Sequence, residues 1–113
     1  PLLPFINDTR ANVGAILAAC AEAGVGGIVS FGMGVTLRAG NREYFYAQLD
    51  KSFPGIRARY EKHFGYAYSC LSANNSALMR FASDFCAERH MCFGAENVLN
   101  ALRQMPSREP RLF

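Results

Sequence analysis

Apolar residues recur at helical spacing in several segments of the chain. The first stripe lies between residues 13 and 20 and consists of Val13, Ile16, Leu17 and Cys20. Residues 7–9 (NDT) precede it with oxygen side chains that can cap a helix, and Gly24 follows as the expected helix end. The same spacing predicts four more helices, at residues 41–53, 56–64, 74–86 and about 96–105.

Two segments have the pattern of β-strands. Residues 26–31 form a continuous β-branched and aromatic run between glycines, which predicts a strand buried on both faces. Residues 1–6 are apolar and bracketed by prolines, so they predict the end of another strand. With the intervening helix the two form a right-handed βαβ crossover. We interpret residues 66–73 and 91–94 as loops, and residues 106–113 as a polar tail that frays.

The predicted elements do not make a complete sheet, because parallel strands normally occur buried in sheets of several strands. The sequence therefore predicts a helix-rich α/β fold, the end of a domain whose beginning is missing. In such folds ligands bind at the carboxyl ends of the strands, which here is the loop of residues 32–40.

Composition and charge limit the classes of protein to which this chain can belong. Half of the 113 residues are hydrophobic, which excludes a disordered chain, and no apolar run approaches the ~20 residues of a membrane span. Nothing resembles a secretory leader. The net charge is +3, and Arg57, Arg59 and Lys62 alternate with apolar positions, as on a solvated helix face. Contact with nucleic acid remains the alternative interpretation.

The candidate chemical groups show no standard motif. The four cysteines, Cys20, Cys70, Cys86 and Cys92, include no Cys-x-x-Cys pair, so we expect no disulfide scaffold and a reducing, cytoplasmic compartment. We interpret Cys20 and Cys86 as small buried residues on the apolar faces of helices. We interpret His63 and His90 as residues near helix C-termini, and expect no metal site. The tyrosines and phenylalanines of residues 44–68 are interpreted as core, with base stacking as the alternative.

Four strings and two residue pairs resemble one enzyme family. They are residues 1–8 (PLLPFIND), 27–34 (GIVSFGMG), 36–38 (TLR) and 40–46 (GNREYFY), together with Asn74-Asn75 and Leu112-Phe113. These strings are similar to the C-terminal half of radical S-adenosylmethionine proteins related to spore photoproduct lyase. The family's cluster motif, Cys-x-x-x-Cys-x-x-Cys, does not occur in this sequence.

The resemblance implies a C-terminal fragment of a partial (β/α)₆ TIM-like barrel. Residues 1–65 would be its last strand and helix units, and residues 66–113 a helical extension. The parent would use a [4Fe-4S] cluster to cleave S-adenosylmethionine to a 5′-deoxyadenosyl radical, with DNA as a substrate in a repair lyase. The fragment would hold neither cofactor and would be inactive without the missing N-terminal half of the barrel.

The resemblance also implies where the site lies. Gly32 and Gly34 would let the backbone approach the cofactor, and Met33 would pack beside the adenine. Asn7 and Asp8 would lie on the substrate side, with helix capping as the alternative. We expect the isolated fragment to self-associate through its open strand. The competing hypotheses are a non-catalytic helical interaction module and a small nucleic-acid-binding domain.

Overall fold

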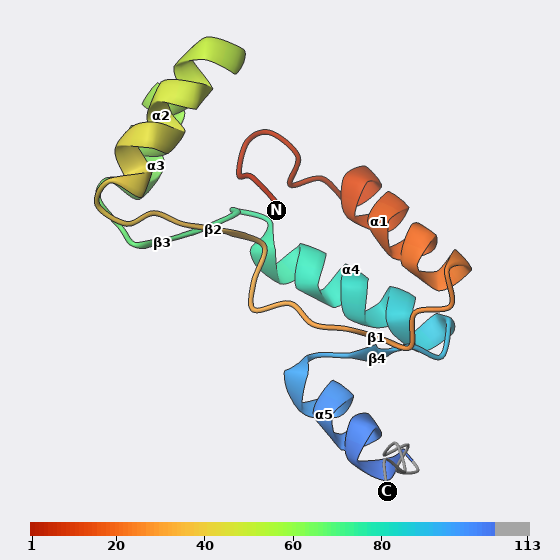
Figure 1. Cartoon of the computed structure of the whole chain (residues 1–113). Coiled ribbons are helices and arrows are strands. Elements are labelled where there is room, and N and C mark those ends of the chain that lie inside the picture. The colour runs from red at the N-terminus through yellow and green to blue at the C-terminus, as the bar shows by residue number, and fades with distance from the viewer. Residues whose placement is uncertain (106–113) are drawn as a thin grey trace, which may run out of the picture.

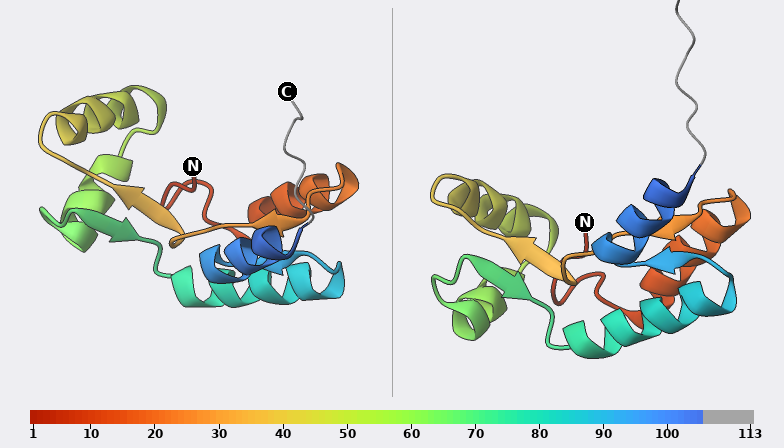
Figure 2. Two further views of the ribbon diagram at one scale, coloured as in Figure 1. Left: turned by 60° about the horizontal axis from the view of Figure 1, so that its bottom comes forward. Right: turned by 90° about the horizontal axis from the view of Figure 1, so that it is seen from below.

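The computed structural model describes residues 1–105 of the chain (Figure 1). Helices and short strands follow one another in the order α1 (Arg10–Glu22), β1 (Gly27–Ile28), β2 (Gly34–Thr36), α2 (Asn41–Ser52), α3 (Ile56–Phe64), β3 (Ser69–Leu71), α4 (Asn75–Glu88), β4 (Cys92–Phe93) and α5 (Ala95–Gln104). The elements form two units, with the α2–α3 pair and the α1–α4 pair at opposite ends of an elongated molecule (Figure 2). The helix-rich α/β prediction is confirmed at this level, since β1 and β4 are parallel.

The first unit contains α1, α4, α5 and the parallel pair of β1 and β4. Helices α1 and α4 lie side by side, and their buried residues meet Met33 and Met91 in one core. Thr9 caps α1 by accepting a hydrogen bond from the Asn12 N–H at 3.1 Å, and Gly24 follows the helix with a φ of +81°. Both ends of this helix were therefore predicted correctly from the sequence.

The second unit contains α2, α3 and the antiparallel pair of β2 and β3. Leu37, Tyr46, Leu49, Tyr60 and Cys70 form its buried core, with Tyr60 and Cys70 fully inaccessible to solvent. The interpretation of the aromatic residues as core is confirmed for Tyr46 and Tyr60. It is wrong for the remaining tyrosines, since the exposed set comprises Tyr44, Tyr66 and Tyr68.

The strands differ most from the prediction. The strand expected over residues 26–31 is limited to Gly27–Ile28, and Phe31 is 91% exposed. Residues 1–6 contain no strand and enter a turn at residue 4, so they do not pair with β1 and the predicted crossover between them is wrong. The partner of β1 is β4, in the segment 91–94 that was expected to be a loop. Two-residue strands have too few positions to show an alternating pattern.

The two segments predicted as separate parts are in contact. Helix α4 and strand β4, from residues 66–113, pack against α1 and β1 from residues 1–65. The expected fraying of residues 106–113 falls outside the described residues. Among residues 1–105, no helix is both long and apolar enough to cross a membrane.

Candidate functional site

The loop that leaves the carboxyl end of β1 is fixed by its own backbone and by α4. The Gly32 N–H donates to the Ser30 Oγ at 3.3 Å, and Gly32 has a φ of +136°, which side-chain-bearing residues rarely adopt. The Met33 N–H donates to the Asn75 Oδ1 at 2.7 Å, at the start of α4. The loop is therefore held in one shape, with the Phe31 ring projecting into solvent.

Ser72 joins this loop to the N-terminal segment. Its N–H donates to the Met33 carbonyl at 2.8 Å, and its hydroxyl donates to the Asp8 carboxylate. The same hydroxyl accepts a hydrogen bond from the Asn74 N–H at 3.0 Å. Because Ser72 is only 4% exposed, these bonds are shielded from water and link three separate segments of the chain.

The structure thus brings together some of the predicted site residues and separates others. Asp8 and Met33 meet through Ser72, but the Asn7 side chain bonds to Leu3 and Pro1 within its own turn. Sequence reasoning missed Ser72, which lies in a segment interpreted as loop. The start of α4 at Asn74-Asn75 was recognised, but nothing in the sequence indicated that the Asn75 side chain reaches Met33.

The two glycines of the loop have different surroundings, so a side chain would be excluded at each for a different reason. A Cβ on Gly34 would lie 2.2 Å from the Cys70 carbonyl oxygen and 2.7 Å from the Leu71 Cα, so β3 occupies that space. A Cβ on Gly32 would lie 2.9 Å from a methyl group of Leu71. The close approach at Gly34 is therefore made by the protein's own backbone.

Two hollows adjoin the loop. One of about 410 Å³ is lined by Pro1, Phe31, Gly32, Gly34, Val35, Thr36, Ser69 and Leu71. The other, of about 220 Å³, is almost wholly apolar and includes the Met33 side chain, which is 4% exposed and part of the first core. Of the predicted cofactor residues, the glycines therefore face the first hollow and Met33 faces the second.

The ionisable groups of the described residues do not converge on this loop. No group of three or more His, Cys, Asp or Glu side chains in residues 1–105 could hold a metal ion. The four thiols are free, and burial raises the pKa of Cys70 and of Cys86, so both stay protonated at neutral pH. His63 lies in the last turn of α3, and His90 follows the end of α4, as the sequence predicted.

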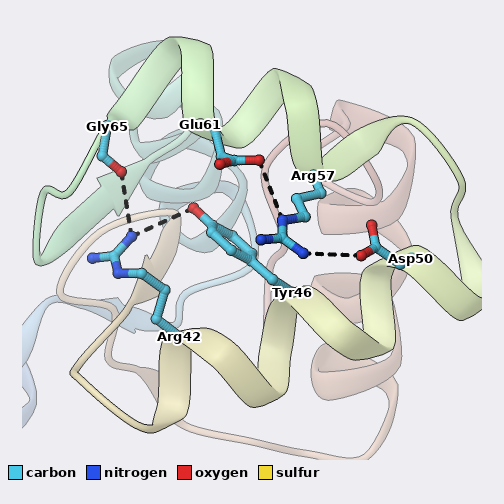
Figure 3. A network of polar contacts seen from close by, with 6 residues as sticks. All are labelled: Arg42, Tyr46, Asp50, Arg57, Glu61 and Gly65. Carbon is cyan, nitrogen blue, oxygen red and sulfur yellow. Dashed lines mark hydrogen bonds and ion pairs between the residues drawn. The ribbon is translucent and has the colours of Figure 1, made fainter.

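Arg42 and Arg57 of the second unit make their hydrogen bonds and ion pairs within that unit (Figure 3). Arg57 forms ion pairs with Asp50 at 3.1 Å and with Glu61 at 3.2 Å on an exposed face. Arg42 donates to the carbonyls of Ala67 at 2.8 Å and Leu37 at 3.0 Å. The prediction that Arg57, Arg59 and Lys62 lie on a solvated face is confirmed.

Comparisons with known proteins give no further guide to the site. A scan against protein-family models finds no match to this sequence, and searches of curated proteins and of solved structures find none either.

Proposed function

We propose that this chain is the C-terminal part of a radical S-adenosylmethionine enzyme related to spore photoproduct lyase. In this proposal β1 and β4 are the last strands of a partial (β/α)₆ barrel. The observation that carries it is the fixed loop at the carboxyl end of β1, since barrel enzymes bind their ligands at that end of the strands. Three of the sequence strings that resemble the family, at residues 27–34, 36–38 and 40–46, run from β1 through this loop into α2.

The loop offers a surface that fits S-adenosylmethionine. The Phe31 ring is exposed beside a hollow of about 410 Å³, and an aromatic face is suited to stack on adenine. Gly32 presents backbone at the same hollow. Met33 is buried, so we propose that it anchors the loop. Gly34 leaves the space that β3 occupies.

The iron–sulfur cluster would be held by the other half of the barrel. A cluster of this type needs closely spaced thiolates, and the four cysteines of this sequence do not have the Cys-x-x-x-Cys-x-x-Cys spacing. When bound, the cluster and S-adenosylmethionine would supply the 5′-deoxyadenosyl radical. Asp8 is the substrate-side candidate, with DNA as the proposed substrate. Free thiols fit a reducing, cytoplasmic compartment.

The first test is to read the gene upstream of Pro1. The proposal requires a Cys-x-x-x-Cys-x-x-Cys motif roughly 150–200 residues before this position, the length of the missing barrel half. A reading frame without that motif would exclude the family and would favour the non-catalytic alternatives.

The second test measures cofactor affinity in the longer protein with its cluster assembled. Phe31→Ala should weaken S-adenosylmethionine binding by more than about tenfold, equivalent to 1.4 kcal/mol. Tyr66→Ala is the matched control, because this aromatic ring is 95% exposed in the second unit and should change the affinity less than about twofold. Calorimetric titration of both variants gives the result, and unchanged affinity of Phe31→Ala would place the cofactor elsewhere.

A further inference from the structure

Within residues 1–105, one edge of strand β1 has no partner strand. The Cys92 N–H donates to the Gly26 carbonyl at 3.0 Å, and the Gly94 N–H donates to the Ile28 carbonyl at 2.9 Å. Because successive backbone groups of a strand point to opposite sides, the N–H and C=O groups of Gly27 and Val29 face away from β4. Within the described residues β4 is the only strand that pairs with β1, so these groups form an open edge.

β1 is short, which by itself limits edge pairing, but this edge lacks the other features that usually protect an edge strand. Proteins keep such edges apart with charged residues, prolines or bulges. Residues 25–31 contain no charge and no proline, and Val25 and Val29 are 37% and 47% exposed. An unprotected edge of this kind is a template for pairing with another strand.

Apolar surface continues from the edge onto both faces of β1. On the α5 side a groove of about 360 Å³ is lined by Gly26, Gly27, Cys92, Val98, Ala101, Leu102 and Met105. On the α1 side the apolar hollow of about 220 Å³ contains Ile28 and Ile16. Leu102, Met105 and Ile16 are about half exposed, at 56%, 58% and 49%.

We propose that β1 pairs antiparallel with β1 of a second copy of the chain, across a two-fold axis. A two-fold interface uses the same surface patch on both copies. Charged residues in that patch would therefore lie close to the same charges of the second copy. The described residues that line the two apolar hollows include no charged side chain, which makes the surface self-compatible. Pairing would satisfy the free groups of Gly27 and Val29 and cover the apolar residues on both faces.

This inference concerns residues 1–113 by themselves and does not rest on the proposed cofactor. In the longer protein proposed above, the preceding half of the barrel would compete for the same edge. The two proposals fail separately, because the upstream cysteine motif is read from the gene and the dimer is measured on this chain.

Sedimentation equilibrium of the full chain tests the pairing. Wild-type protein should sediment as a dimer, and Val29→Lys should raise the dissociation constant at least tenfold. Val29→Pro removes the outward N–H without touching the bonds to β4, so it should weaken the dimer in the same way. Tyr66→Lys adds the same charge at an exposed position of the second unit and should leave the dimer intact.

Circular dichroism of each variant shows that it folds before the masses are compared. A wild-type chain that is monomeric at high concentration overturns the proposal. A dimer that survives both Val29 substitutions in folded protein overturns it as well, because the interface would then lie on another surface.

Discussion

Gly34 shows how a single backbone position fixes the contact between two strands. It pairs with Leu71, and its missing side chain leaves the space that the Cys70 carbonyl occupies. Gly26, eight positions earlier, has no atom within 4 Å of the place where a Cβ would stand. The two glycines look alike in the sequence, but only one of them is required by packing.

The substitution Gly34→Ala should therefore destabilise the chain strongly. The added methyl group meets backbone atoms that cannot rotate away, so the cost in the free energy of unfolding should reach the upper end of the about 1–3 kcal/mol that is typical of overpacking. Gly26→Ala is the control and should change that free energy by less than about 0.5 kcal/mol. Urea denaturation of both variants decides the point, and equal stabilities would mean that β2 and β3 are not in close contact.

Tyr60 is the residue whose ionisation should set stability at high pH. Burial, and to a lesser extent nearby Cys70, raises the pKa of its phenol, whose hydroxyl donates to the Pro4 carbonyl at 2.8 Å. The folded chain keeps a proton that the unfolded chain loses above about pH 10, so stability should fall as the pH rises from there. The slope for one such proton is up to about 1.4 kcal/mol per pH unit.

Urea denaturation at several alkaline pH values measures this slope. Tyr60→Phe removes the titrating group, so the free energy of unfolding of this variant should depend less steeply on pH above 10. At neutral pH the variant should be less stable than the wild type, because it lacks the hydrogen bond to Pro4. The buried thiols of Cys70 and Cys86 have pKa values shifted in the same direction, and they contribute equally to both proteins. Parallel curves for the two proteins would show that Tyr60 does not control alkaline unfolding.

At the scale of elements, one side chain of the second unit, that of Arg42, connects α2 to three other segments of the unit. Arg42 projects from α2 and donates to the Leu37 carbonyl after β2, to the Gly65 carbonyl after α3, and to the Ala67 carbonyl before β3. A guanidinium group can make this set of bonds because it is planar and carries five donors. Arg57, on the next helix, bonds only to exposed carboxylates.

The two arginines should therefore differ in their effect on stability. Arg42→Ala leaves three carbonyl groups without their donor and should lower the free energy of unfolding by about 2 kcal/mol. Arg57→Ala breaks two exposed ion pairs and should cost no more than about 1 kcal/mol. Thermal unfolding followed by circular dichroism compares them, and a larger loss for Arg57→Ala would contradict this assignment.

At the scale of the whole molecule, the first eight residues hold the two units together. Leu2 packs on the core of the first unit, whereas Phe5 packs on that of the second. The Phe5 ring lies 5.6 Å from the Tyr60 ring, and Asp8 bonds to Ser72 between the units. Figure 2 shows this segment lying between the two ends of the molecule.

Phe5→Ala should uncouple the unfolding of the two units. All five tyrosines lie in residues 44–68 and there is no tryptophan, so tyrosine fluorescence reports only the second unit. In the wild type, fluorescence and far-ultraviolet circular dichroism should give coincident transitions, and in the variant the fluorescence transition should come first. Phe53→Ala, at a half-exposed position in the second unit, is the control and should keep the transitions together.

The predictable part of the fold follows from local chemistry. The helices were found because their apolar residues repeat over nine or more positions and because caps such as Thr9 and Gly24 act within one turn. The strands were misplaced because they have two or three residues each and are defined by partners far along the chain, as in the pairing of Gly27 with Cys92. Ser72 was missed for the same reason, since its importance comes from Asp8 and Met33.

By itself the sequence determined the five helices and their ends, the solvated face around Arg57 and the absence of a cluster motif, since each depends on neighbouring residues or on composition. Only the tertiary structure decided that β1 pairs with β4, that Met33 anchors the loop from the inside, and that Phe31 is its exposed residue. These features depend on contacts between segments that are 40 or more positions apart. Such contacts are selected by the packing of the whole chain and leave no periodic signal in any one segment.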